Sequence, residues 1–169
     1  LSQYDKIYLL DAYVAFAKNW KRDHNEEETF DQRVSDKDME EIRDRVAKEF
    51  AKEFTRVLST EGGHQVVTEG GDGVLILRPA IINLEVTAPD LMTPGMSETV
   101  VASAGSMTLY LELYDGKTQA IIARIIDPEA ADNVGIAQVA NRVTNTANFD
   151  RVLHRWAEIL NSHLAQLKK

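Results

Sequence analysis

Apolar and polar side chains alternate most regularly within residues 97–127. From Met107 to Leu113 the odd positions are apolar, whereas the even positions are polar or aromatic. This period of two predicts a strand with one buried face and one solvent-facing face. The mostly apolar segment 118–126 follows a turn in which Gly116 can adopt a positive φ. We therefore predict a long β-hairpin around which the rest of the chain is organised.

The register of this hairpin depends on the length of its turn. A three-residue loop places Leu109 opposite Ile121, whereas a two-residue loop places Met107 opposite Arg124. We prefer the first register because it gathers the apolar odd positions on one face of the sheet. The exposed face of the sheet is then a candidate contact surface, and it carries Thr108, Tyr110, Glu112 and Arg124.

Two segments have apolar residues at every third or fourth position, which predicts amphipathic helices over residues 35–58 and 149–168. Ser35 and Asp38 have the spacing of a capping box at the start of the first helix. Asn148 is in the position of an N-cap for the second helix.

Shorter apolar runs predict strands over residues 4–10, 64–68 and 74–86. Pro79 interrupts the last of these, and we expect an edge or a bulge there because proline cannot donate to a strand ladder. Segment 11–21 has aromatic residues at helical spacing, which predicts an irregular or helical turn.

These elements predict one α+β domain spanning residues 1–169. We expect two layers, with an antiparallel sheet of about four or five strands and two main helices packed on one face. The polar segment 22–34 and the weakly periodic segment 128–147 are expected to be excursions from this core.

Composition limits the classes of function. The chain has 169 residues, 19 basic and 27 acidic side chains, and a formal net charge of −8. This charge argues against a general electrostatic attraction to nucleic acid or to anionic lipid. No apolar run approaches the roughly 20 residues of a membrane span. The chain has no cysteine, which excludes disulfides and thiolate metal sites within it, and its start at Leu1 suggests a mature or trimmed fragment.

A search for catalytic chemistry assigns no catalytic, cofactor or metal residue. His154 lies one helical turn from Asp150 and Glu158, but this is the pattern of an exposed polar pair rather than of a metal site. Asp115 and Asp127 are expected at opposite ends of a hairpin arm, too far apart for joint acid–base work. We do not expect the glycines of segment 69–73 to form a phosphate-binding loop, because a strand follows them and the loop pattern has no Lys or Ser/Thr. We therefore expect that the chain is not an enzyme.

Several features resemble a family of proposed bacterial lipoproteins of unknown function, domain of unknown function 3313. They are the order of the segments, the strand 76–81, the hairpin 105–127 with Tyr-Asp-Gly-Lys-Thr at its turn, and the pair Trp156-Ala157 in the closing helix. The family favours an Asp-Ser-x-Thr-Gly-like turn, whereas residues 115–119 of this chain lack the final glycine. The resemblance implies a periplasmic protein of a Gram-negative envelope, anchored to the outer membrane by a lipidated cysteine upstream of Leu1.

Two functions follow as hypotheses. The first is a non-enzymatic binding or assembly module whose partner is an envelope protein or the cell wall, with no nucleic-acid partner and with membrane contact only through the upstream anchor. The second is a small-ligand-binding or hydrolytic domain with a pocket near the aromatic residues of segment 11–24. The sequence leaves the identity of the partner and the oligomeric state open.

Overall fold

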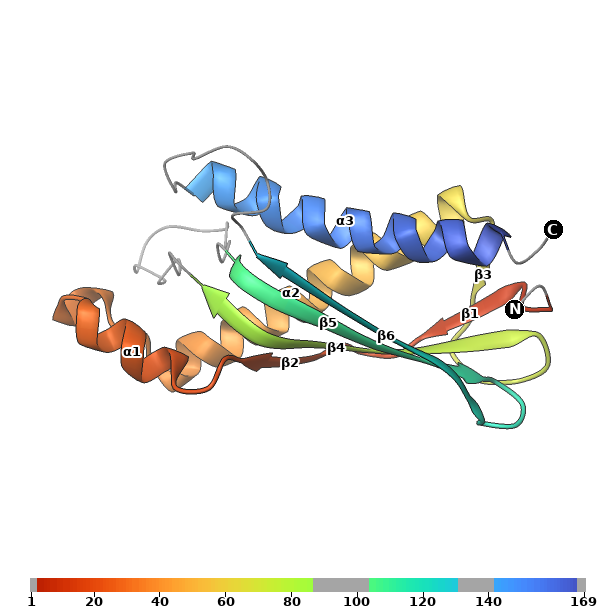
Figure 1. Cartoon of the computed structure of the whole chain (residues 1–169), viewed down its shortest axis with the longest axis horizontal. Helices are drawn as coiled ribbons and strands as arrows, with labels where there is room; N and C mark the ends of the chain where they lie inside the picture. The colour runs from red at the N-terminus through yellow and green to blue at the C-terminus, as the bar shows by residue number, and fades with distance from the viewer. Residues whose placement is uncertain (1–2, 87–103, 131–141, 167–169) are drawn as a thin grey trace.

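The computed structural model describes residues 3–86, 104–130 and 142–166. In this part the chain forms a six-stranded sheet with two long helices, α2 and α3, on one side of it (Figure 1). The strands are β1 (Lys6–Leu9), β2 (Tyr13–Phe16), β3 (Gln65–Val66), β4 (Val74–Val86), β5 (Ala104–Asp115) and β6 (Ile121–Ala130). The α-helices are α1 (Trp20–Glu27), α2 (Asp36–Arg56) and α3 (Arg142–Gln166), and two short helical turns span Phe30–Gln32 and Val57–Glu61.

The sheet is mixed, so the prediction of a purely antiparallel sheet of four or five strands is wrong. Its order is β3-β1-β4-β5-β6, with β2 also paired to β4. β1 and β2 run parallel to β4, whereas β4, β5 and β6 are antiparallel. The parallel pairs arise because α2 crosses over between the first two strands and β4, and a crossover of this length permits parallel pairing. The prediction of an α+β fold is confirmed.

The β5–β6 hairpin is confirmed, but its predicted register is wrong. Leu109 pairs with Asp127 rather than with Ile121. The connection is longer than three residues because the Asp115 carboxylate accepts the backbone N–H groups of Lys117 and Thr118 at 3.0 and 2.7 Å, which builds a wider turn. Along most of the hairpin the two registers differ by an even number of residues, so odd positions such as Leu109 and Leu113 lie on one face as predicted. Ile121 is the exception, because a register shift pairs it with Tyr114 of the other face.

Gly116 is required in this turn for a different reason from the one predicted. The positive φ, 62°, belongs to Gln119 and not to Gly116. The amide of Gly116 instead donates to the carbonyl of Val74 at 2.8 Å. A Cβ at position 116 would lie 2.6 Å from that carbonyl oxygen, so only glycine allows the turn to approach β4 this closely.

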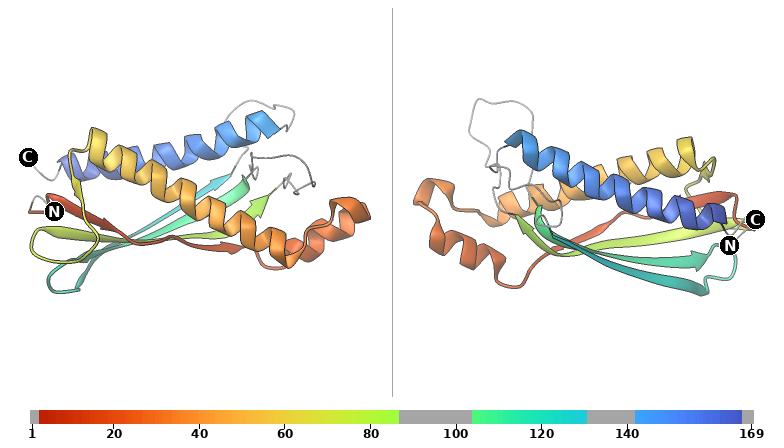
Figure 2. Two further views of the ribbon diagram at one scale, coloured as in Figure 1. Left: turned by 180° about the vertical axis from the view of Figure 1, so that it is seen from behind. Right: turned by 45° about the horizontal axis from the view of Figure 1, so that its top comes forward.

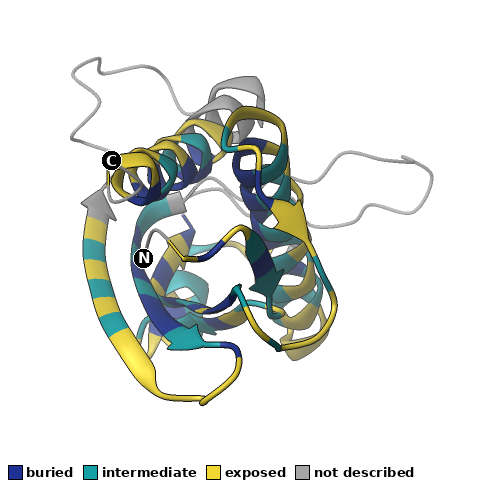
Figure 3. Ribbon diagram, turned by 90° about the vertical axis from the view of Figure 1, so that its right-hand side faces the viewer, coloured by how far each residue is buried: buried dark blue, intermediate teal, exposed yellow. Residues whose placement is uncertain are grey.

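Helices α2 and α3 cover one face of the sheet, as predicted (Figure 2). In the view along the length of the molecule, residues coloured as buried lie on the sides of the helices and the sheet that face each other (Figure 3). The largest fully buried side chains of this core include Phe50, Phe54, Leu75, Leu77, Ile81, Leu111 and Leu153. The burial of these apolar groups is the main stabilising contribution to the fold.

The predicted capping box of α2 is confirmed. The hydroxyl of Ser35 accepts the amide of Asp38 at 3.1 Å, and the Asp38 carboxylate accepts the amide of Ser35 at 2.8 Å. The predicted cap of the second helix is wrong, because α3 already begins at Arg142 and Asn148 lies inside it. β6 and α3 extend into the two ends of the predicted excursion 128–147, and residues 131–141 lie outside the described part.

One further prediction near the N-terminus is wrong. Segment 11–21 contains the strand β2 rather than only an irregular or helical turn. Segment 22–34 contains most of α1 and the helical turn Phe30–Gln32, and Trp20 buries the start of α1 against the core. The side chain of Asn25 then ties the helix to the backbone of Val34 through two hydrogen bonds of 2.9 and 2.7 Å.

Pro79 lies in a central strand and not at an edge. The pairing of β4 with β1 ends at Leu77, and its pairing with β2 begins at Ala80. The carbonyl of Leu77 accepts the amide of Leu10 at 2.9 Å, and Pro79, two residues further, is oriented toward the same side. The missing N–H of proline therefore falls at the break between β1 and β2, where neither strand needs it.

None of the helices in the described part of the chain combines the length and the apolar character that a bilayer crossing requires.

Candidate functional site

The sheet face that points away from the helices carries a polar cluster. The alternation of β5 places Tyr110, Glu112 and Tyr114 on this outer face. Arg78 of β4 and Arg124 of β6 pair with Glu112 from either side. We call these five residues the Glu112 cluster. The predicted gathering of Tyr110, Glu112 and Arg124 on one face is thus confirmed, whereas Tyr114 and Arg78 were not predicted to join it.

Glu112 is surrounded by hydrogen-bond donors. The phenol of Tyr114 donates to its Oε2 at 2.6 Å, and the phenol of Tyr110 donates to its Oε1 at 3.1 Å. Arg124 donates through Nε to Oε1 at 3.0 Å, and Nη1 of Arg78 lies 3.7 Å from Oε2. Glu112 is only 9% exposed although it lies on the open face. Its side chain is therefore covered by its own partners.

These donors determine the charge of the cluster. The hydrogen bonds from Tyr114 and then from Arg124 lower the pKa of Glu112, because they stabilise the ionised carboxylate. Both oxygens already accept hydrogen bonds, which leaves little capacity to take a proton from a substrate. The carboxylate is thus suited to orient the tyrosines and arginines around it rather than to act as a general base.

The surroundings of the cluster combine cationic and apolar groups. The side chains of Arg78 and Arg124 are 65% and 60% exposed. Ile121 and Ile126, which pair with Tyr114 and Tyr110 of this face, are also exposed. Within the described residues, Arg124 uses only Nε toward Glu112, which leaves its Nη groups for a partner.

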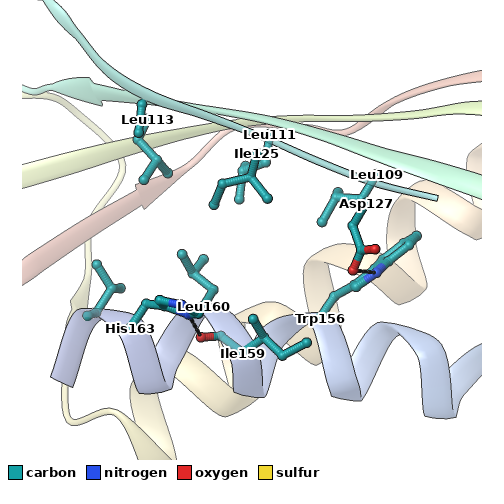
Figure 4. Close-up of a pocket in the computed structure, with 11 residues that line it drawn as sticks. Leu109, Leu111, Leu113, Ile125, Asp127, Trp156, Ile159, Leu160 and His163 are labelled. Carbon is teal, nitrogen blue, oxygen red and sulfur yellow. Dashed lines mark hydrogen bonds between the residues drawn. The ribbon is translucent and has the colours of Figure 1, made fainter. Parts of the chain in front are cut away.

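An apolar cleft lies on the opposite face of the sheet, between α3 and the β5–β6 hairpin (Figure 4). Its volume is about 300 Å³. At one end the indole N–H of Trp156 donates to Asp127 at 3.0 Å, and at the other end lies His163. Sequence reasoning missed this cleft because it depends on the distance between α3 and β6. The sequence feature that could have indicated the cleft is Asp127, a charged residue at an odd, inward-facing position of β6.

The aromatic residues of segment 11–24, where the alternative hypothesis placed a pocket, pack against one another. Phe16 stacks on Trp20 with ring centroids 4.6 Å apart, and Trp20 stacks on His24 at 5.1 Å. Trp20 is buried, and its indole N–H donates to the carbonyl of Val86 at 3.3 Å. The apolar cleft takes none of its lining residues from this segment.

His154 links the two long helices. Its Nδ1 lies 2.7 Å from Glu53 of α2, and its Nε2 lies 3.2 Å from Glu158 of α3. Arg56 donates to the same Glu53 at 2.7 Å and is the main reason why the pKa of Glu53 is lowered. Asp150 does not join this network. Among the described residues, no group of three His, Asp or Glu side chains is arranged to hold a metal ion.

Most of the chain matches a known family model. The model of DUF3313, described as a protein of unknown function, matches residues 19–160. A comparison with curated proteins finds no match.

Three solved structures are similar to the chain at low sequence identity. A minor lipoprotein from Acinetobacter baumannii is 11% identical with a TM-score of 0.40, over 98% of this chain and 95% of that one. A Xanthomonas campestris protein of the family DUF330 is 13% identical with a TM-score of 0.43, over 95% and 84%. A protein described as a neuraminyllactose-binding hemagglutinin homologue from Helicobacter pylori is 10% identical with a TM-score of 0.37, over 96% and 88%.

Proposed function

This chain belongs to the DUF3313 family of proteins of unknown function, and we propose that it is a non-enzymatic binding module of the bacterial cell envelope. The module captures a protein partner through the outer sheet face. The envelope location and a lipidated cysteine upstream of Leu1 rest on the family resemblance described above. The binding role rests on the Glu112 cluster.

The composition of the outer face supports a protein partner. Arginine and tyrosine are enriched in the centres of protein interfaces and among the residues that dominate binding energy. Here both types are held in place by the same carboxylate, so little side-chain freedom is lost when a partner binds. The exposed Ile121 and Ile126 add apolar area beside them.

The charge of the cluster indicates the chemistry of the partner. Arg78 and Arg124 outnumber the single carboxylate between them, in a chain whose net charge is −8. Guanidinium groups bind carboxylates with two parallel hydrogen bonds. The partner surface is therefore one that places a carboxylate among apolar or aromatic side chains.

A catalytic role has weaker support. The candidate carboxylate, Glu112, is occupied by donors from three side chains. His154 is occupied by glutamates on both sides. A binding role uses the Glu112 cluster as it stands, whereas catalysis would require breaking it.

Selection from a random peptide library tests the binding role without knowledge of the natural partner. The immobilised chain is expected to enrich peptides that combine Asp or Glu with aromatic residues. The double variant Arg78→Ala/Arg124→Gln is expected to lose this enrichment.

The matched control is Arg151→Gln, which removes an exposed arginine from α3. Enrichment that survives the double variant, or that disappears equally in the control, would contradict a binding role for the outer face.

The membrane anchor requires a separate test on the full-length precursor. Metabolic labelling with an alkyne fatty acid is expected to label the precursor at a cysteine upstream of this domain, and a Cys→Ala change there is expected to release the protein into the soluble periplasmic fraction. An unlabelled precursor would contradict the anchor but would leave the binding role of the outer face untouched.

A further inference from the structure

Strand β6 is the last strand of the sheet, and within the described residues no strand pairs with its outer edge. In β5, the amide of Asp115 donates to the residue directly before β6, whereas the amide of Gly116, which follows, donates to β4. Backbone groups alternate in direction along a strand, so the odd residues of β5 bond to β6. Their partners in β6 are also odd. The even residues Arg124 and Ile126 therefore direct their amides and carbonyls away from the sheet.

Pro128 agrees with this orientation of the backbone. It is also an even residue of β6, so its missing N–H falls at the free edge and costs no bond to β5. At the other end, a register shift opposite Leu113 and Tyr114 interrupts the regular pairing. Proline and irregular pairing both limit the addition of a further strand. Between these two points the backbone groups of Arg124 and Ile126 remain a template for one.

The inner face of β6 is incompletely covered. Leu111 of β5 is 1% exposed, whereas its partner Ile125 on β6 is only partly buried. Ile159 lines the apolar cleft from the opposite wall, on α3, and is 40% exposed (Figure 4). A strand added to the edge would direct every second side chain toward this side of the sheet. Apolar side chains at these positions would remove the surface of Ile125 and Ile159 from water.

The remaining side chains of an added strand would lie beside the outer face of the sheet. A residue paired with Arg124 has its side chain on the same face, with the two Cβ atoms about 5 Å apart. The Arg124 side chain is 60% exposed, and it binds Glu112 through Nε alone. A carboxylate on the added strand can accept hydrogen bonds from the Nη groups. Charge complementarity therefore favours Asp or Glu at the outer positions.

A second copy of this chain fits the edge less well. Antiparallel pairing of two β6 edges, about a two-fold axis in the middle of the free stretch, places two Arg124 side chains opposite or diagonal to each other. Like charges at such positions disfavour pairing. The charge at the edge therefore favours an acidic segment of another protein.

We propose that the edge of β6 binds an extended segment of the protein partner by strand addition, and that apolar and acidic side chains alternate along this segment. Its apolar side chains face α3, and its acidic side chains lie beside Arg124. The inference rests on the proposed function and adds to it the conformation and the side-chain pattern of the partner. Backbone hydrogen bonds to Arg124 and Ile126 provide affinity, whereas the alternating side chains provide specificity.

A designed peptide tests the edge. The probe is a fluorescent peptide with blocked ends, long enough to span the free edge, in which Glu and Val alternate. Fluorescence anisotropy is expected to show saturable binding to the folded chain. The control peptide has the same composition but carries all Glu before all Val. It should bind about tenfold more weakly or not at all, because it cannot direct Val toward α3 and Glu toward Arg124 together.

Two variants at one position test the backbone of the edge. Ile126→Pro removes the outward N–H, whereas Ile126→Ala shortens the side chain and keeps the N–H. The amide of residue 126 faces away from β5, so the proline breaks no bond within the sheet. Ile126→Pro is expected to bind the probe about tenfold more weakly than Ile126→Ala, the size of one favourable hydrogen bond. Amide NMR spectra establish that both variants are folded.

N-methylation of the peptide tests strand addition without any change in the chain. Successive N–H groups of a bound strand point in opposite directions. Methylation of one alternate set of peptide nitrogens is therefore expected to abolish binding, whereas methylation of the intervening set is tolerated. Equal effects of the two sets would overturn strand addition.

The outcomes separate this inference from the proposed function. Binding that is lost in Arg78→Ala/Arg124→Gln but ignores both Ile126→Pro and the methylation pattern would support the outer face and overturn strand addition. Binding that follows Ile126→Pro and the methylation pattern but persists without the arginines would support strand addition and contradict the role of the arginines. Failure of the alternating peptide to bind, or a dimer in sedimentation that Ile126→Pro dissociates, would overturn the inference.

Discussion

Tyr114 and Glu112 lie two residues apart on the outer face of β5, and the phenol of Tyr114 donates a 2.6 Å hydrogen bond to Glu112. Side chains at i and i+2 of a strand share a face, so this contact follows from local geometry. It is also the main reason why the pKa of Glu112 is lowered. The ionised carboxylate in turn fixes the tyrosines and Arg124 in the orientation that we assign to partner binding.

Removing this phenol is predicted to raise the pKa of Glu112. In Tyr114→Phe the carboxylate loses the strongest of its donors, so its ionised form is less favoured than in the original chain. NMR titration of the Glu112 side-chain carboxyl carbon measures the change. Tyr13→Phe is the control, because Tyr13 is 67% exposed and lies on another strand. A pKa that is the same in Tyr114→Phe and in the original chain would contradict the account.

Asp115 is predicted to make stability depend on pH in acid. The backbone amide of Thr118, then Tyr4 and the Thr118 hydroxyl, lower the pKa of Asp115 from 3.8 to about 2. Because the folded pKa lies below the unfolded one, this stabilisation is present above 3.8 and is lost as the pH falls toward about 2. In Asp115→Asn the free energy of unfolding should therefore fall less steeply as the pH decreases, as measured by urea unfolding across this range. In Asp11→Asn, at an exposed position, the free energy of unfolding should fall with decreasing pH as steeply as in the original chain.

The close approach of the hairpin turn to β4 predicts a difference between two glycines. Gly116→Ala places a methyl group 2.6 Å from the Val74 carbonyl oxygen and should lower the free energy of unfolding by about 1–3 kcal/mol. Gly71→Ala meets no atom within 4 Å, and a change below about 0.5 kcal/mol is expected there. Denaturant unfolding of both variants measures the difference, and equal effects would show that the approach to β4 is not tight.

The hydrogen bond between Trp156 and Asp127 predicts a rescue. Trp156→Phe leaves the Asp127 carboxylate without its donor and should lower the free energy of unfolding by about 1–3 kcal/mol. Adding Asp127→Leu removes the unpaired carboxylate, so the double variant should recover much of the loss. Denaturant unfolding of the two single variants and the double variant measures the coupling. Strictly additive losses would contradict a direct contact.

The face of each β5 residue was predictable from sequence, whereas the hairpin register was not. Alternation is local, so the inward position of Leu109 required only the pattern of its own strand. The register depends on the hydrogen bonds that the Asp115 side chain makes inside the turn, which no apolar pattern reports. The predicted and observed registers differ by an even number of residues along most of the hairpin, so the side chains of β5 lie on their predicted faces, whereas Ile121 pairs with Tyr114 beyond a register shift.

Features that depend on packing between distant segments were missed. The parallel pairing of β1 with β4 requires the crossover by α2, and Arg78 reaches Glu112 only because β4 pairs with β5. The apolar cleft results from the separation of α3 from β6, although its residues had been assigned to buried stripes. Tyr110, Glu112 and Arg124 were predicted together because they lie on consecutive strands of one hairpin.

Photo-cross-linking in intact cells tests the binding role of the outer sheet face most directly. A photoreactive phenylalanine analogue at Ile126, which is 64% exposed on that face, should give one covalent adduct of defined mass. Arg78→Ala/Arg124→Gln should abolish the adduct, and the same analogue at Lys52, exposed on α2, should not form it. Identical adducts from positions 126 and 52, or an adduct at Ile126 that persists without the two arginines, would contradict the account.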